Sequence, residues 1–238
     1  MKDCEKLKRM KKSSSPISKT ESESQLDYWN RRARGDDRFK SIKSYLLISF
    51  FRTGFVGFNR IREYFYVNKN LIGTTVLDAG CGDGSFMSKL KKINKNSVFY
   101  GFDFSHYMIK HAKKRGMLCC VSNLTSINFR DETFDTSYAV RSLKNLLSWE
   151  MQKKALSEIS RVTKYRVIIF DSFKFDDDIS EKYNYFLDEK KLVETMREFG
   201  FVVMDKRFYD RKSSLNPFSS RNKELGGFVF NRKKEINE

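Results

Sequence analysis

The chain has 238 residues, of which 39% are hydrophobic and 15% aromatic, and it contains only two prolines. It exceeds the usual single-domain size of roughly 100–200 residues but is short for two domains, which favours one α/β domain with extensions. Its net charge is +17, and no apolar run approaches the roughly 18–20 residues that cross a bilayer, which excludes a membrane-spanning helix.

The basic residues gather at the two ends of the chain. Residues 1–70 carry a net charge of +9, residues 71–205 only +3, and residues 206–238 +5. Such flanks suit phosphate groups or an anionic membrane surface, and they equally suit solvated lysines that bind nothing. These alternatives stay open at the level of the sequence.

The cysteines argue against a metal site. Cys4, Cys81, Cys119 and Cys120 form no C-x-x-C pair and have no histidine at ligand spacing, so we expect no zinc, no disulfide framework and a reducing compartment. The first 19 residues are charged and lack the apolar core of a secretory signal. We therefore expect a cytoplasmic protein.

Two segments precede the expected sheet. Residues 1–24 alternate lysine clusters with serines and bury too little apolar surface to order, so they are predicted to form a disordered tail. Residues 25–70 are predicted to form two amphipathic cap helices. The first would pack through Phe39, Ile42, Leu46 and Phe50. The second would pack through Phe58, Ile61 and Phe65, with Arg60 and Arg62 on its polar side.

From residue 71 to 238, short apolar runs alternate with helical stretches, which is typical of βαβ units in a Rossmann-like, doubly wound α/β sheet. Strands are predicted at Thr75–Ala79, Val98–Asp103, Leu118–Ser122, Phe134–Val140 and Arg166–Ser172. Helices are predicted at Ser85–Ile93, His106–Arg115, Trp149–Val162 and Glu189–Phe199. Phe201–Phe208 and Gly227–Asn231 have no helix between them, so they should pair as antiparallel strands and complete a sheet of about seven.

Residues at the ends of these helices support the assignment. Ser105, Ser148 and Asp188 stand where an N-cap is needed, because their side chains can accept a hydrogen bond from a free backbone amide. Gly116 and Gly200 stand where a helix should stop. The predicted boundaries therefore rest on capping chemistry as well as on periodicity.

The segment Val76–Gly84 runs from an apolar strand into a glycine-rich turn and then a helix. Glycines let the backbone approach a ligand without a Cβ in the way, at the strand edge where open α/β sheets bind ligands. The G-x-G-x-G spacing differs from the G-x-G-x-x-G of pyrophosphate-binding dinucleotide sites, which disfavours NAD or FAD. The alternative is a purely structural turn.

A carboxylate, Asp103, ends the next predicted strand 19 residues beyond Gly84. An acidic side chain there can accept hydrogen bonds from both hydroxyls of a ribose, or it can cap the following helix. Phe104 can lie on an adenine face or pack in the core. The glycine turn and the carboxylate together predict a nucleoside-containing cofactor, provided that the two meet at one edge of the sheet.

These segments resemble a known family. Val76–Gly84 resembles motif I of the class I S-adenosylmethionine-dependent methyltransferases, Asp103 the acidic residue of motif II, and Ser122-Asn123-Leu124 with Ile127–Asp135 the third and fourth motif region. The similarity spans about residues 73–172, and more loosely extends to 231. It is greatest to the methyltransferase type 11 branch, which includes ubiquinone- and menaquinone-biosynthesis enzymes. The resemblance implies S-adenosylmethionine as cofactor and methyl transfer by in-line displacement.

The resemblance also implies roles for individual residues. Gly80, Cys81 and Gly82 would supply backbone around the methionine part of the cofactor, and Asp78 would orient its amino end. Asp103 would hold the ribose, and Asn123 with the Leu124 amide would meet the adenine. Val140 and Arg141 would border the sulfonium and the acceptor.

The chain departs from the family pattern at two places. Asn123 stands where relatives commonly have aspartate, although an asparagine oxygen can still accept a hydrogen bond from the adenine amine. Lys164-Tyr165-Arg166 stands where relatives often have a Pro-Gly-Gly turn, so the shape of that segment is not predicted.

No catalytic base is predicted, because methyl transfer mainly needs alignment and electrostatics unless the acceptor must first lose a proton. His106 and His111 are expected at the surface. Tyr28, Trp29, Tyr183 and Tyr185 lie in segments that could cap the site.

Three hypotheses concern the acceptor. A small molecule ranks first, with the cap helices and the Asp176–Phe186 insertion as a lid over a partly apolar pocket. An RNA acceptor, tRNA or rRNA, ranks second, since the basic flanks could track phosphates. The chain has no Asn-Pro-Pro-Tyr motif and no Pro-Cys dipeptide, which disfavours two base-directed RNA mechanisms.

A non-catalytic cofactor-fold binding subunit ranks third, because the intact glycines and Asp103 argue against a decayed site. Peripheral membrane contact through the helix around Phe39–Phe50 is a further alternative. Packing of that helix on the sheet is favoured over it.

Overall fold

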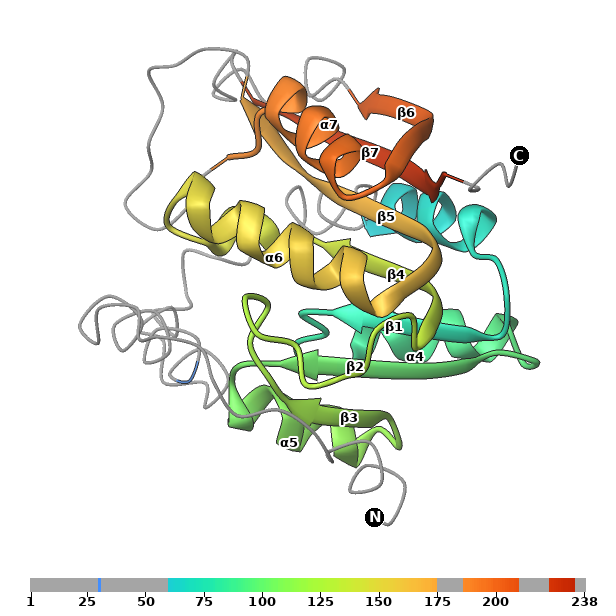
Figure 1. Ribbon diagram of the computed structural model, residues 1–238. Coiled ribbons are helices and arrows are strands. Elements are labelled where there is room, and N and C mark those ends of the chain that lie inside the picture. Colours follow the sequence, from blue (N-terminus) through green and yellow to red (C-terminus); the bar gives the residue numbers. More distant parts are fainter. Residues whose placement is uncertain (1–29, 31–59, 175–185, 210–222, 234–238) are drawn as a thin grey trace, which may run out of the picture.

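The computed structural model describes residues 30, 60–174, 186–209 and 223–233 (Figure 1). The predicted tail, the first cap helix, Phe58, and residues 176–185 of the proposed insertion lie outside these ranges, so those predictions stand untested. The described residues form a seven-stranded sheet in the order β3-β2-β1-β4-β5-β7-β6. This confirms the predicted Rossmann-like sheet. Within the described part, no helix is long and apolar enough to cross a membrane.

Six of the seven strands run in the same direction, and β7 alone runs opposite to them. β1 (Thr75–Ala79) lies between β2 (Val98–Asp103) and β4 (Phe134–Val140), while β3 (Leu118–Val121) flanks β2 and β5 (Thr163–Lys174) flanks β4. β7 (Lys223–Arg232) pairs antiparallel with both β5 and β6 (Phe201–Tyr209). The chain order reverses at β1, so the carboxyl ends of β1, β2 and β4 meet where open α/β sheets bind ligands.

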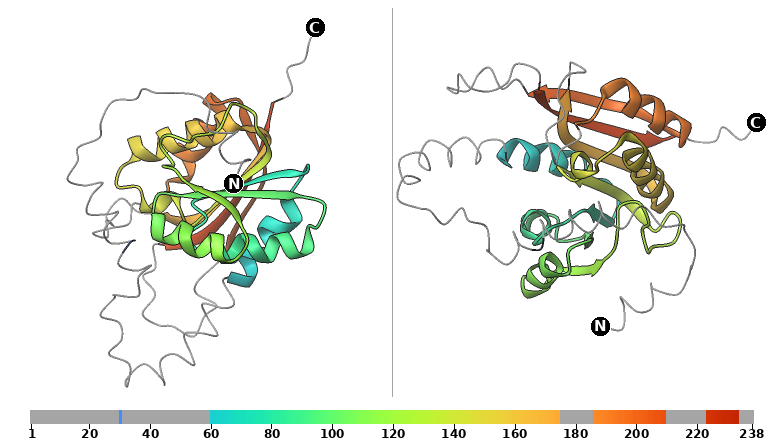
Figure 2. Two further views of the ribbon diagram at one scale, coloured as in Figure 1. Left: turned by 90° about the horizontal axis from the view of Figure 1, so that it is seen from below. Right: turned by 90° about the vertical axis from the view of Figure 1, so that its left-hand side faces the viewer.

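Helices cover both faces of the sheet (Figure 2). The helix at residues 60–70, α4 (Ser85–Ile93) and α5 (His106–Lys114) lie on one face. α6 (Trp149–Val162) and α7 (Glu189–Glu198) lie on the other, and the short helix η2 (Leu143–Asn145) precedes α6. The predicted caps are confirmed, because the side chains of Ser105, Ser148 and Asp188 each accept a hydrogen bond from the amide three residues on.

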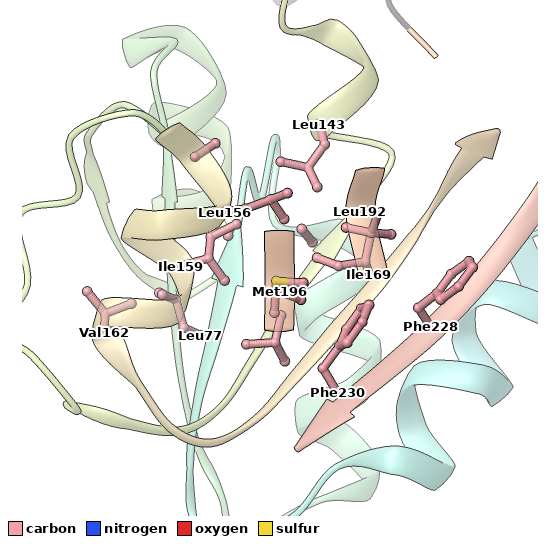
Figure 3. Packing of buried hydrophobic residues seen from close by; sticks show 14 of the residues in the cluster. Leu77, Leu143, Leu156, Ile159, Val162, Ile169, Leu192, Met196, Phe228 and Phe230 are labelled. Carbon is pink, nitrogen blue, oxygen red and sulfur yellow. The ribbon is translucent and has the colours of Figure 1, made fainter. Parts of the chain in front are cut away.

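The core has a layer on each side of the sheet, because strands covered on both faces must be apolar on both. On the α6 and α7 side, side chains from both helices point toward β5 and β7 (Figure 3). The labelled residues there are Leu77, Leu143, Leu156, Ile159, Val162, Ile169, Leu192, Met196, Phe228 and Phe230. On the other side, Tyr66, Met87 and Leu90 pack against Phe99, Ile168 and Phe170.

The predicted packing face of the second cap helix is wrong. Ile61 and Phe65 are 52% and 65% exposed, whereas Tyr66 and Val67 are buried. Helical spacing allows either side of the helix to face the sheet. The side that is buried is the one that carries Tyr66, whose ring packs on Phe170 with 5.6 Å between ring centroids. The helix is thereby rotated so that Glu63 also faces inward.

The segment that lacks the Pro-Gly-Gly turn continues directly into the sheet. Thr163 both ends α6 and begins β5, so Lys164, Tyr165 and Arg166 are strand residues. The Thr163 hydroxyl donates a hydrogen bond to the Ile159 carbonyl, 2.6 Å away, which satisfies a helix-end acceptor in place of a glycine turn. β5 therefore starts three residues earlier than predicted.

The helix at 60–70 approaches the sheet closely at Gly227. A Cβ built on Gly227 would lie 2.5 Å from Cε1 of Tyr66, whose ring is buried. We expect Gly227→Ala to lower the free energy of unfolding by about 1–3 kcal/mol, because overpacking forces a buried ring aside. Urea unfolding measures this cost. The cost should shrink in a Tyr66→Leu background, and an equal cost in both backgrounds would contradict the proposed clash.

Candidate functional site

The loop between β1 and α4 is held open by three glycines with positive φ. The φ angles of Gly80, Gly82 and Gly84 are 88°, 54° and 72°, values that side chains other than glycine rarely adopt. The amides of Gly80 and Cys81 both donate to the Phe102 carbonyl, at 3.0 and 2.8 Å. A Cβ on Gly80 would lie 2.7 Å from that of Ser142, while one on Gly82 would meet nothing within 4 Å. The loop thus presents bare backbone to open space at Gly82.

Asp103 meets this loop directly. Its Oδ2 accepts a hydrogen bond from the Gly82 amide at 3.0 Å, and its Oδ1 accepts one from the Ser105 amide at 3.0 Å. Burial raises the pKa of the carboxyl, while these backbone amides and that of Phe104 oppose the rise. The glycine turn and the carboxylate predicted from the sequence therefore converge at one edge of the sheet.

A cavity opens at this edge. It is lined by six of the nine predicted cofactor-site residues, namely Gly80, Gly82, Asp103, Phe104, Asn123 and Leu124. Its other walls are Phe102, Met108, Ser122, Arg141, Ser142, Asn145, Leu146 and Met151. Most of the wall is apolar, with one carboxylate and a stretch of bare backbone. That combination suits a nucleoside with an apolar or aromatic neighbour.

Asn123 is occupied within its own turn. Its Oδ1 accepts hydrogen bonds from the amide and the hydroxyl of Thr125, at 3.0 and 3.1 Å. A carbonyl oxygen has two lone pairs, so this oxygen has no acceptor capacity left for an adenine amine unless the turn rearranges. Of the two adenine contacts predicted here, the Leu124 amide is the better candidate.

Three predicted residues, Asp78, Cys81 and Val140, do not line the cavity. The Cys81 side chain packs with Ile109, Ala112 and Cys119. Asp78 is buried, and its Oδ2 accepts a hydrogen bond from the Tyr138 hydroxyl at 2.9 Å. Burial raises the pKa of Asp78 to about 7, and the nearby Asp103 adds to the rise. Asp78 is thus buried away from the cavity lining.

The raised pKa of Asp78 predicts a pH-dependent stability. Between its unfolded pKa, about 3.9, and its folded pKa, about 7, the folded state holds the proton that the unfolded state releases, so stability falls as pH rises. Between pH 5.5 and 8, we expect the free energy of unfolding of the wild type to fall by about 2 kcal/mol relative to that of Asp78→Asn. Parallel urea titrations of the two proteins test this. A constant difference across that range would refute the buried titration.

Arg141 has a conformation that the sequence did not suggest. Its φ is 55°, in the left-handed region that costs a side chain about 1 kcal/mol or more. Its amide donates to the Phe170 carbonyl at 2.8 Å, and its carbonyl accepts from Asn145 Nδ2 at 2.9 Å. Its guanidinium pairs through Nε and Nη2 with Oε1 of Glu63, a fully buried carboxylate on the helix at 60–70. The cavity wall at the end of β4 is therefore tied to the N-terminal helix.

Sequence reasoning missed several wall residues. Ser142, Asn145, Leu146 and Met151 follow β4 in the chain, where the rule that ligands bind at the carboxyl ends of strands would have found the first of them. The Ser142 hydroxyl is buried and has no hydrogen-bond partner within the described residues. Asn30 gave no signal at all, yet its Oδ1 accepts a hydrogen bond from the Ser105 hydroxyl at 2.7 Å.

The other residues singled out in the sequence are two histidines and four aromatic residues. His106 and His111 are exposed, as predicted. Tyr28, Trp29, Tyr183 and Tyr185 lie outside the described residues. Within the described part, no group of histidine, cysteine and acidic residues is arranged to hold a metal ion.

Comparison with known proteins gives the chain relatives. Residues 77–170 match the family described as "Methyltransferase domain". The chain is 33% identical over 92 residues to a tRNA (carboxymethyluridine(34)-5-O)-methyltransferase of Arabidopsis thaliana, covering 39% of this chain and 22% of that protein. It is 26% identical over 103 residues to a probable tRNA methyltransferase 9B of Homo sapiens, covering 43% and 21%. The chain thus spans about a fifth of the length of these two relatives.

The fold has close structural counterparts. A geranyl diphosphate C-methyltransferase from Streptomyces coelicolor A3(2) superposes with a TM-score of 0.68 at 14% identity, covering 92% of this chain and all of that one. At this identity the likeness concerns the fold alone.

Proposed function

Because residues 77–170 are a methyltransferase domain of the class I S-adenosylmethionine-dependent superfamily, we propose that the chain transfers the methyl group of S-adenosylmethionine to a tRNA nucleoside. The cofactor part rests on one observation, the hydrogen bond between the Gly82 amide and Asp103 at the mouth of the cavity. The acceptor part rests on relatives whose names describe tRNA methyltransferases, together with the net charge of +17. The sequence alone ranked a small molecule first, and the names of these relatives are our reason for proposing tRNA instead.

The residues present fit the cofactor. Gly82 leaves space where a Cβ would otherwise project, so backbone can approach the methionine part of the ligand. Asp103 has acceptor capacity for a ribose hydroxyl beyond the hydrogen bonds that it accepts from backbone amides. Phe104 and Leu124 line the cavity and can flank an adenine ring. S-adenosylmethionine, when bound, supplies an electrophilic methyl group on a sulfonium.

The chain contributes alignment and exclusion of water. Leu146 and Met151 make the cavity wall beyond Ser142 apolar, so an acceptor entering there displaces water from the reacting centre. The Ser142 hydroxyl can donate to an acceptor oxygen, since it has no partner within the described part of the chain. Holding the acceptor atom in line with the methyl group accounts for most of the catalysis that such a site can give.

A labelled-methyl assay tests the proposal. The full chain, labelled S-adenosylmethionine and a cell extract are incubated, and the label is fractionated into RNA, protein, lipid and small molecules. We expect the label in tRNA, and we expect it to vanish with Asp103→Asn. Label in protein or lipid would refute the acceptor. The absence of any turnover, with S-adenosylmethionine still bound, would favour the non-catalytic binding subunit.

A small-molecule acceptor is the second candidate. The apolar wall formed by Phe102, Met108, Leu146 and Met151 favours it, because a cavity for one small ligand buries most of that ligand against apolar side chains. Label that appears only in the small-molecule fraction would establish this candidate in place of tRNA.

A further inference from the structure

Basic and acidic residues are distributed unequally between the two helical faces of the sheet. α4 and α5 carry six lysines and no acidic residue. α6 and α7, on the opposite face, carry six basic and five acidic residues. Although residues 71–205 have a low net charge, their uncompensated basic residues gather on one face of the sheet. We call the six lysines of α4 and α5 the α4–α5 face: Lys89, Lys91, Lys92, Lys110, Lys113 and Lys114.

These lysines are exposed and uncompensated. All six are exposed, and none forms an ion pair within the described residues. The opposite face neutralises itself, since Lys153 pairs with Glu198 at 2.7 Å and Arg161 with Glu158 at 2.7 Å. Like charges on neighbouring helices raise the electrostatic potential and attract a polyanion more than a mixed surface does.

The face also contains a groove that could seat a chain of phosphates. Between α5 and the edge strand β3 the surface is hollowed, and the hollow is lined by His106, Lys110, Lys113 and Lys114 over an apolar floor of Ile109 and Val121. Three ammonium groups and an imidazole thus border a single depression. A strand of phosphates can lie there while its bases point away from the protein.

The position of the face connects it with the candidate active site. α4 begins one residue after Gly84, and α5 begins three residues after Asp103, so both helices lead away from the cavity mouth. Lys110 and Lys114 lie four and eight residues after His106, which places them about 6 and 12 Å along the helix axis. Phosphates bound there would belong to nucleotides close to the one in the cavity.

We infer that the α4–α5 face binds the phosphate backbone of the RNA strand that carries the methyl acceptor, an inference that rests on the proposed function. A bilayer is the competing anionic partner, but interfacial helices turn a broad apolar face outward. Here the apolar residues Met87, Leu90 and Ile109 are buried against the sheet, and Ile93 is the one large exposed hydrophobic side chain that the described α4 and α5 carry. The exposed apolar surface beside these lysines is limited to Ile93 and to Leu118 and Val121 of β3, so charge dominates the face, which suits a phosphate backbone.

The test compares matched triple variants of the full chain. One variant carries Lys110→Gln, Lys113→Gln and Lys114→Gln on α5, and the control carries Lys154→Gln, Lys190→Gln and Arg197→Gln on α6 and α7. Each removes three charges from exposed helical positions. Binding of total tRNA is measured by fluorescence anisotropy between 50 and 200 mM KCl. Binding of S-adenosylmethionine is measured by calorimetry on the same proteins.

We expect the α5 variant to bind tRNA at least tenfold more weakly at 100 mM KCl, and the slope of log K against log[KCl] to fall by about 2. The control should change by less than threefold, and both variants should keep wild-type affinity for S-adenosylmethionine. Equal losses in the two variants, or no loss in either, would overturn the inference. The inference would also be overturned if the α5 variant lost binding to vesicles of 30% phosphatidylserine in phosphatidylcholine but kept its binding to tRNA.

The two proposals fail in different ways. If the α5 variant loses tRNA affinity but wild type methylates no tRNA, the phosphate-binding face stands and the proposed acceptor falls. If both variants methylate tRNA with the KM of wild type, the proposed acceptor stands and the face falls.

Discussion

Replacing Asp103 with asparagine is expected to weaken S-adenosylmethionine binding about 100-fold, measured by isothermal titration calorimetry. A carboxylate that accepts hydrogen bonds from two ribose hydroxyls contributes about 1.5–3 kcal/mol for each bond, and the amide retains only part of this. The amide also turns a donor toward either the Gly82 or the Ser105 amide, both of which now donate to Asp103 at 3.0 Å. The substitution therefore removes the ligand contact and loosens the loop together.

Asp83→Asn is the matched control for this experiment. Asp83 lies in the same glycine-rich loop but does not line the cavity, and it pairs with Arg115 at 2.9 Å on the surface. It should change the cofactor affinity by less than threefold. A thermal melt without ligand separates loss of the site from loss of the fold. An Asp103→Asn protein that remains folded and binds S-adenosylmethionine as wild type does would remove the ribose assignment.

Arg141→Ala is expected to lower the free energy of unfolding by about 3 kcal/mol. The substitution leaves Glu63, a fully buried carboxylate, without its close cation, and an uncompensated buried charge typically costs about 3–5 kcal/mol. The substitution relieves little backbone strain, because alanine is also strained at the φ of 55° that residue 141 adopts. Equilibrium unfolding in urea measures the difference.

Arg60→Ala provides the comparison for Arg141→Ala, because Arg60 contacts the same carboxylate. Its Nη1 lies 3.5 Å from Oε2 of Glu63, and its side chain is 52% exposed, so its loss should cost at most about 0.5 kcal/mol. Adding Glu63→Gln to Arg141→Ala should restore part of the lost stability, because it removes the stranded charge. Equal costs for the two arginines would show that the buried pair does not anchor the helix at 60–70.

Most secondary structure followed from local chemistry. Five predicted elements, Thr75–Ala79, Ser85–Ile93, Val98–Asp103, Phe134–Val140 and Trp149–Val162, have the bounds of β1, α4, β2, β4 and α6, because apolar runs and, for α6, a serine cap fix these ends locally. β7 begins at Lys223, four residues before the predicted Gly227. The pairing of β7 with both β5 and β6 extends it through residues that have no strand pattern of their own.

The site was predictable where a motif carries its own geometry. Gly80, Gly82 and Asp103, which were predicted from the sequence, line the cavity, because positive-φ glycines and a strand-end carboxylate follow from local chain order. Asn30 and Met151 were not found, because the contact of Asn30 with Ser105 and the approach of Met151 to the cavity depend on residues distant in the sequence. The occupied oxygen of Asn123 was likewise invisible, since it depends on how the Thr125 side chain turns back.

The sequence by itself determined the order of strands and helices, the glycine turn and the carboxylate that meets it, since spacing and backbone preference act over a few residues. Only the tertiary structure decided which face of the helix at 60–70 is buried, because Ile61 and Phe65 lie at helical spacing, and so do Glu63, Tyr66 and Val67. The tertiary structure also decided that Glu63 faces Arg141 and that α4 and α5, which carry the six lysines, cover the same face of the sheet. Those arrangements depend on side chains from separate segments meeting across the sheet, which no local pattern encodes.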